Sequence, residues 1–178
     1  MSSLDAVSYE ITRARPDDLK FLAAIELAAA RMLVGHAPEA VLNEATSEEE
    51  LQKAQRCGHV WVALAGDLPV GFAHVKVFEP SVVHLEEIDV HPEYGRRGIG
   101  TQLVKAVCEW ATVSNYRNVT LTTFRDVPWN MPFYRRLGFE EIPSRELTPE
   151  LLFVIEDEVQ RGLDPHSRLA MRFVIRSC

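Results

Sequence analysis

The chain has 178 residues, of which 47% are hydrophobic, and it carries a formal net charge of −7 at a sequence pI of about 5.4. This length suits one domain with a sizeable core, so we predict a single domain over residues 1–178 with its core at about 8–175. The acidic balance argues against a nucleic-acid partner, which needs a basic face to displace counterions from phosphates. It weakly favours cationic partners.

The sequence also bears on the redox state of the cysteines and on contact with a membrane. No stretch is apolar for long enough to span a bilayer, and residues 1–15 lack the basic start and apolar core of a signal peptide. The three cysteines, Cys57, Cys108 and Cys178, show no spacing typical of a zinc or redox pair. We therefore expect reduced thiols, no bound metal, no membrane contact and a cytoplasmic protein.

The N-terminal half predicts a strand, two helices and then three strands. Pro16 suits the first turn of a helix, the turn signals at 35–38 end that helix, and Ser47 is a plausible N-cap for the next one. Alternating apolar residues predict the strands, and a Gly-Asp-Leu-Pro loop at 66–69 joins two of them. The expected ranges are 8–14 (strand), 16–33 and 46–55 (helices), and 59–65, 70–78 and 82–90 (strands).

The C-terminal half alternates helices with strands. Gly138 stands where a helix C-terminus favours glycine, and a short strand follows it. The expected ranges are helix 98–113, strand 118–124, helix 129–137, helix 149–161 and strand 169–175. Together the elements predict a mixed α/β (α+β) fold, with a central sheet of about seven strands flanked by helices, rather than a doubly wound sheet.

The most informative segment joins the strand at 82–90 to the helix at 98–113. Gly95, Gly98 and Gly100 allow the backbone to approach a ligand closely. The first amides of a helix have no internal partners and carry its partial positive charge. The turn therefore suits a pyrophosphate, and Arg96 and Arg97 add full positive charges.

Two motifs resemble those of one family. Residues 90–100, Val-His-Pro-Glu-Tyr-Gly-Arg-Arg-Gly-Ile-Gly, resemble the acetyl-CoA motif of the GNAT superfamily, usually Gln/Arg-x-x-Gly-x-Gly/Ala. Gly95 stands where Gln or Arg is usual, and we expect Arg96 to take the basic role. Residues 132–139 resemble the later motif, in which a helix bearing a tyrosine leads into Leu-Gly-Phe. Many members have an asparagine seven residues before that tyrosine; this chain has Val127 there and Asn130 four before it.

The resemblance implies an N-acetyltransferase that uses acetyl-CoA and needs no metal. It also implies a sheet splayed between the fourth and fifth strands, with the cofactor arm in the gap and the Val90 amide donating to the thioester carbonyl. A donor fixed there would stabilise developing negative charge. The residues expected to contact acetyl-CoA are Ile88, Asp89, Val90, Arg96, Arg97, Gly98, Ile99, Gly100, Thr101 and Asn130.

The resemblance assigns Tyr134 as the acid that protonates the departing thiolate, since a phenol and a thiol have pKa values close enough for proton transfer. For the base we favour His84 and Glu86 jointly, because His84 aligns with a position where several members carry a base. Strand alternation places His84, Glu86, Ile88 and Val90 on one face, and Leu85, Glu87 and Asp89 on the other.

Three functions remain open at this point. The first is acetylation of a primary amine of a small molecule, by direct attack in a ternary complex. The second is acetylation of a protein lysine or N-terminus, and the third is a non-catalytic acetyl-CoA sensor. The acceptor wall is expected to include residues 19–33 and 46–55, and Trp129 either lines an acceptor pocket or simply packs. The resemblance also favours a homodimer.

Overall fold

The computed structural model describes residues 8–78 and 80–176, so Cys178 and residues 1–7 lie outside the described part. It has a seven-stranded sheet in the order β1-β2-β3-β4-β5-β7-β6. Only the pair β4–β5 is parallel; the other neighbours are antiparallel. The strands are β1 (Glu10–Arg13), β2 (Val60–Ala65), β3 (Leu68–Phe78), β4 (Val82–Val90), β5 (Asn118–Phe124), β6 (Glu140–Glu141) and β7 (Arg168–Val174).

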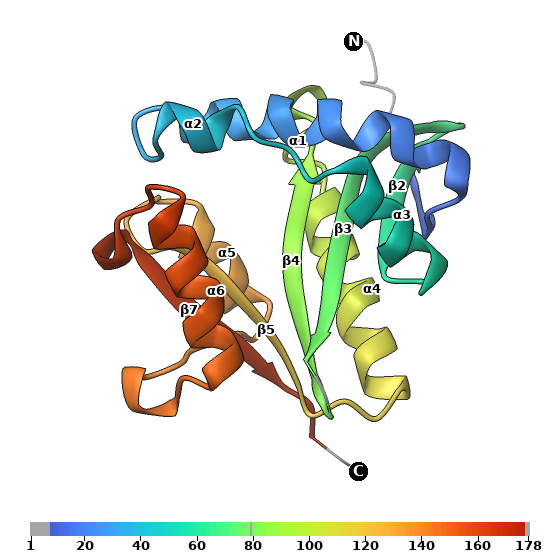
Figure 1. Ribbon diagram of the computed structural model, residues 1–178. Coiled ribbons are helices and arrows are strands. Elements are labelled where there is room, and N and C mark those ends of the chain that lie inside the picture. The colour runs from blue at the N-terminus through green and yellow to red at the C-terminus, as the bar shows by residue number, and fades with distance from the viewer. Residues whose placement is uncertain (1–7, 79, 177–178) are drawn as a thin grey trace, which may run out of the picture.

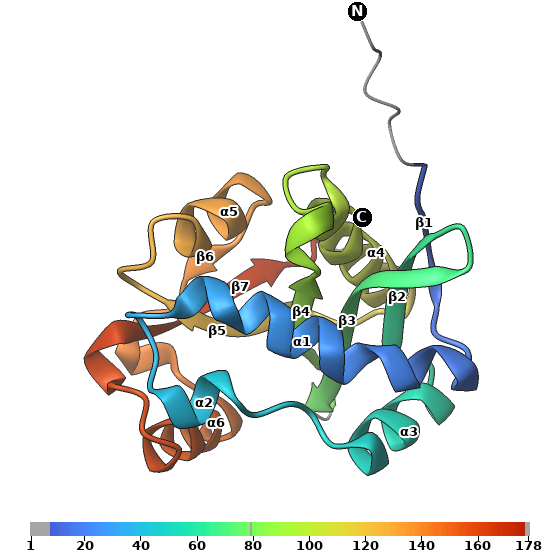
Figure 2. The same cartoon turned by 90° about the horizontal axis from the view of Figure 1, so that it is seen from above.

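Helices cover both faces of this sheet. Figure 2 shows α4 and α5 on one side and α1, α2, α3 and α6 on the other. The helices are α1 (Leu22–Ala30), α2 (Glu39–Leu42), α3 (Glu48–Arg56), α4 (Ile99–Val113), α5 (Asn130–Arg136) and α6 (Pro149–Gln160), and 3-10 turns flank α1 at Pro16–Phe21 and Arg31–Leu33. None of the helices in the described part is long and apolar enough to cross a bilayer.

The predicted mixed sheet with flanking helices is confirmed, and so are the predicted caps. The Ser47 hydroxyl accepts a hydrogen bond from the Glu50 amide at 3.2 Å, and Gly138 after α5 has a φ of 93°. The short helix α2 was not predicted. It has four residues and follows Pro38, which is too short for helical periodicity to be visible in the sequence.

One face of the sheet is largely apolar, and the other carries separate apolar clusters together with buried polar groups. On the α4 side, Val83 and Leu85 of β4 pack with Leu103 and Val107 of α4 in the largest buried cluster. On the other side, one apolar cluster lies under α1 and α3 and a smaller one under α6. Buried polar groups, including His84, also lie on this second face.

A β-bulge in β4 changes which side chains share a face. Leu85 pairs with Val75 and Glu87 pairs with His74, so Glu86 is left without a partner in β3. Because the extra residue interrupts the alternation, the predicted grouping of His84 with Ile88 and Val90 is wrong. The paired residues of β3 place His84, Glu87 and Asp89 on the α1 side, and Leu85, Ile88 and Val90 on the α4 side.

The predicted splay between the fourth and fifth strands is confirmed. β4 and β5 pair only at Val82–Asn118, Val83–Val119 and His84–Thr120. Beyond these pairs the two strands diverge as a V, with α1 and α2 running across its open end (Figure 1). The rest of β4 therefore has free main-chain groups toward the gap.

Candidate active site

The gap between β4 and β5 is part of a large cleft, with a volume of about 1220 Å³. Its walls come from β4, the turn before α4, β5, α5, α1 and α6. The His91 amide donates to Val70 O on β3 at 2.8 Å. Successive strand amides point to opposite sides, so the Val90 amide points away from β3 and into the gap. This is the orientation expected for a donor to a bound carbonyl.

The turn before α4 is shaped as an anion cradle. Arg96 and Gly98 both have positive φ, at 58° and 81°, which turns successive amides toward one side. The first backbone hydrogen bond of the helix runs from Gln102 N to Gly98 O at 3.0 Å. The amides of residues 96–101 donate to no group in the described part of the chain. Free amides at a helix start fit the pyrophosphate of coenzyme A.

The two arginines of the turn lie differently. Arg96 lines the cleft, whereas Arg97 donates through Nη2 to Glu93 O at 3.3 Å and lies over the Tyr94 ring. Asn130, at the start of α5, also lines the cleft. Val127, where an asparagine is frequent in the family, is buried among apolar residues and has no polar group to offer. All the predicted cofactor residues except Arg97 line the cleft.

Tyr134 of α5 also lines the cleft. Its ring packs edge-on against Phe133 and Phe139, with centroids at 5.0 and 5.8 Å. Burial, followed by the nearby carboxylates of Glu87 and Asp89, raises the pKa of the Tyr134 phenol. The phenol therefore stays protonated at neutral pH, but it is a weaker acid than an ordinary tyrosine, and its pKa lies further from that of a thiol than expected from the sequence.

Three carboxyl groups meet at this part of the cleft, which we call the reactive end: Glu26 of α1, and Glu87 and Asp89 of β4. Burial and the neighbouring Glu26 raise the pKa of Glu87 to about 7. Burial and Glu87 raise the pKa of Asp89 well above its ordinary value. Asp89 Oδ2 is buried without a hydrogen-bond partner among the described residues. Glu26 is held by the Thr46 amide at 2.8 Å and its hydroxyl at 3.2 Å.

The two residues predicted as the base lie close together but are engaged elsewhere. The His84 ring is buried beside Phe78, and its Nδ1 lies 3.0 Å from Thr120 Oγ1. Burial lowers the pKa of His84 to about 4, so the ring is neutral at physiological pH. Glu86 pairs with Lys76 at 2.9 Å and lies 3.8 Å from His84 Nε2. Glu87 was missed because the bulge that turns it into the cleft leaves no mark in the sequence.

A second part of the cleft, which we call the distal end, lies between the segment after α2 and the end of α6, and contacts bridge it. Glu44 and Arg161 pair through two hydrogen bonds of 2.6 and 2.9 Å. Val41 packs against a small cluster that includes Phe124 and Leu163. These contacts join the segment after α1 to the segment after α6, and the exposed Glu44–Arg161 pair lies at the surface of this distal end.

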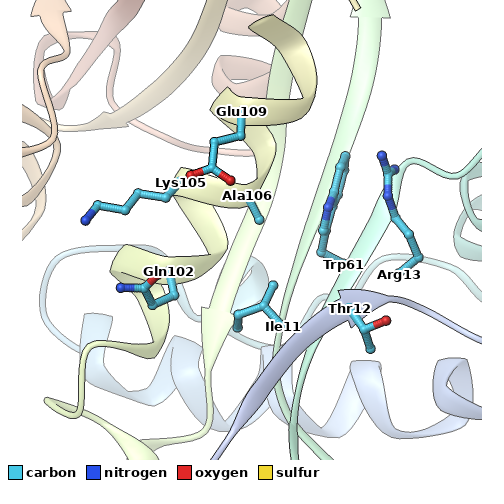
Figure 3. A pocket seen from close by; sticks show the side chains of 8 residues that line it. All are labelled: Ile11, Thr12, Arg13, Trp61, Gln102, Lys105, Ala106 and Glu109. Carbon is cyan, nitrogen blue, oxygen red and sulfur yellow. The ribbon is translucent and has the colours of Figure 1, made fainter. Parts of the chain in front are cut away.

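A second hollow, of about 360 Å³, lies between β1, β2 and α4 (Figure 3). The Arg13 guanidinium stacks over the Trp61 ring at 3.8 Å, and Lys105 projects from the helix. The residues that line this hollow are all absent from the lining of the cleft. It is therefore separate from the cleft.

A strand gap with an inward amide, a turn with free amides and a group of neighbouring carboxyls suits an acyl-transfer site. Comparison with known proteins gives the family: residues 23–139 match the acetyltransferase (GNAT) family. The aminoglycoside N(6')-acetyltransferase type 1 of Salmonella typhimurium is 31% identical over 115 residues, which cover 60% of this chain and 77% of that protein.

Solved structures agree on the fold. The PaiA N-acetyltransferase from Thermoplasma acidophilum, in complex with coenzyme A, has a TM-score of 0.73 at 18% identity, covering 94% of this chain and 99% of that one. N-acetylglutamate synthase from Neisseria gonorrhoeae has a TM-score of 0.72 at 14% identity, over 96% of this chain and 36% of that one. The chain belongs to the GNAT family and is an acetyl-CoA-dependent N-acetyltransferase.

Proposed function

We propose that the protein transfers the acetyl group of acetyl-CoA to a primary amine of a small molecule, by direct attack within a ternary complex. The observation that carries this proposal is that one continuous cleft holds both the free amides of residues 96–101 and the acids of the reactive end. Donor and acceptor can therefore be bound together, with no need for an acetylated enzyme intermediate.

The proposed roles follow from the positions of the side chains. Coenzyme A would be held by the amides of residues 96–101 and by Arg96, and when bound it supplies the acetyl group as a thioester. The Val90 amide donates to the carbonyl oxygen of that group. Glu87 takes a proton from the acceptor ammonium, so that the nitrogen can form its bond to the carbonyl carbon. Tyr134 gives a proton to the sulfur as the carbon–sulfur bond breaks, and the second proton of the attacking nitrogen restores the phenol, which leaves a neutral amide.

Two observations support a small acceptor over a protein. The Glu44–Arg161 pair and the packing around Leu163 bridge the distal end, which leaves little room for an extended peptide. The Salmonella relative is named for acetylation of an aminoglycoside, a small amine. The sensor alternative is disfavoured because the reactive end carries acid and base groups that binding alone does not need.

A pH–rate comparison tests the assignment of the base. With a Glu87 pKa of about 7, kcat/KM should rise as pH increases through about 7, since the base must lose its proton. Glu87→Gln should lower kcat/KM by about 100- to 1000-fold at pH 8 and remove the rise. His84→Asn and Glu86→Gln should keep the wild-type profile.

If Glu87→Gln keeps the wild-type pH profile of kcat/KM and His84→Asn or Glu86→Gln loses it, the base is one of the two residues predicted from the sequence. Calorimetric titration with coenzyme A serves as the folding control, because none of these side chains belongs to the phosphate cradle. If no amine releases thiol from acetyl-CoA while coenzyme A still binds, the proposed transfer itself is wrong.

A further inference from the structure

The charges in the cleft are distributed unevenly, and this limits the acceptors that fit. At the reactive end, Glu26, Glu87 and Asp89 form no ion pair with any basic side chain in the described part of the chain. An acceptor ammonium entering there meets carboxyl groups that no basic side chain of the described part pairs with, although Arg161 and Arg168 act on Glu26 and Glu87 from further away. It would supply the partner that Asp89 Oδ2 lacks.

Three other carboxylates of the cleft lining are neutralised by ion pairs. Glu86 pairs with Lys76 at 2.9 Å, and Glu44 pairs with Arg161 at 2.6 Å. Glu158 pairs with Arg168 through two hydrogen bonds of 2.7 and 3.0 Å, and both side chains are nearly buried. Glu150 and Asp157 are exposed on α6, where water solvates them. Among the described residues, therefore, no unpaired buried carboxylate lines the distal end to face a second cation.

Apolar side chains supply the remaining walls of the distal end. Phe124 and Leu163 are buried there, and Leu33 and Val41 pack beside them. Larger apolar side chains stand exposed at the mouth of the cleft: Met32 at 54%, Trp129 at 44% and Phe153 at 72%. Exposed large apolar groups gathered around a cleft mark a binding surface for an apolar ligand.

We infer that the acceptor is an amphipathic monoamine: a primary ammonium that binds at the reactive end, on an apolar body that fills the distal end. This rests on the proposed function and narrows its substrate class. A polycation such as an aminoglycoside or a polyamine would place its second charge against apolar walls and paired carboxylates. Burying such a charge without a partner is costly, so these acceptors are poor ones.

A matched pair of acceptors tests the inference. n-Hexylamine and 1,6-diaminohexane have the same chain and differ only in the distal charge. Thiol release from acetyl-CoA should give a kcat/KM at least about tenfold higher for n-hexylamine. From n-propylamine to n-hexylamine, kcat/KM should rise by about threefold for each methylene. Spermidine and kanamycin should be used less well than n-hexylamine.

A charge variant gives a second, independent readout. Arg161→Gln leaves the Glu44 carboxylate unpaired at the distal end, so the ratio of diamine to monoamine kcat/KM should rise by about fivefold. Arg145→Gln is the matched control, since Arg145 belongs to an exposed ion pair with Glu146 and does not line the cleft. It should leave the ratio unchanged.

Each outcome decides between the alternatives. Equal or better use of 1,6-diaminohexane, spermidine or kanamycin would overturn the inference while leaving small-molecule acetylation intact. An unchanged diamine ratio in Arg161→Gln would also count against it. If no amine of any class releases thiol, the proposed function fails and takes the inference with it.

Discussion

The two faces of the central sheet carry opposite chemistry on the same strands. On the α4 face, Val83, Leu103 and Val107 are fully buried in one continuous apolar cluster. On the opposite face, His84, Glu87 and Asp89 stand at neighbouring positions of β4, and the apolar packing is divided between α1 and α6. The α4 face supplies most of the apolar packing that stabilises the fold. The opposite face is less fully packed and forms the cleft.

The bulge at Glu86 produces this division. It sends Leu85 and Ile88 to the α4 face although three positions separate them, and it places Glu87 and Asp89 on the cleft face. Regular alternation would bring Glu87 onto the apolar face, where burying a carboxylate is costly. Stability and activity should therefore be separable in this molecule, with substitutions on the α4 face changing the first and substitutions in the cleft changing the second.

Truncation on the α4 face should affect stability alone. Leu103→Ala removes a fully buried side chain and should lower the free energy of unfolding by about 3 kcal/mol. At 20 °C, where the protein remains folded, kcat/KM should stay within about twofold of wild type. Urea denaturation and thiol-release assays measure the two effects. A cost below about 1 kcal/mol would show that this face is less tightly packed than we describe.

Removal of the Tyr134 hydroxyl on α5 should affect activity alone. Tyr134→Phe keeps the ring contacts with Phe133 and Phe139 and should lower kcat by about 100-fold, with the Kd for coenzyme A within about twofold. Tyr116→Phe is the matched control, because Tyr116 packs against Trp110 on the α4 side. Unchanged turnover in Tyr134→Phe would show that another group protonates the thiolate.

The fold could be predicted from the sequence because its signals are local. The proline at the first turn, the Ser47 cap and the alternation in β2 and β3 each depend on a few neighbouring residues. The turn at 95–100 could also be predicted, since a glycine-rich junction between a strand and a helix is typical of an anion-binding site. The short helix α2 was not predicted because four residues are less than two helical turns.

The reactive end was less predictable, and the reason is physical. A bulge adds one residue to a strand without a required residue type, so alternation beyond Glu86 assigned Glu87 and Asp89 to the wrong face. Glu26 was missed because it reaches β4 through tertiary packing of α1 over the sheet. Burial of His84 likewise depends on neighbours distant in sequence, such as Thr120.

The smallest predicted effect concerns the cost of keeping acids in the cleft. The folded-state pKa of Glu87 is raised by burial to about 7, above its value in the unfolded chain. Folding therefore favours the protonated carboxyl. That contribution is fully present below the unfolded-state pKa and is lost as pH rises through about 7. Above pH 7 the ionised carboxylate destabilises the fold.

Glu87→Gln should therefore stabilise the protein at pH 8 by roughly 1–2 kcal/mol, a value reduced for partial exposure to water. This corresponds to about 2–8 °C in Tm, with little change at pH 4.5. Glu49→Gln is the control, since Glu49 is an exposed residue of α3 and should show no such pH dependence. An equal Tm shift at both pH values would mean that the amide improves packing instead. Ionised carboxylates on the cleft face would then not destabilise the fold, and the difference between the two faces would have to be explained by packing alone.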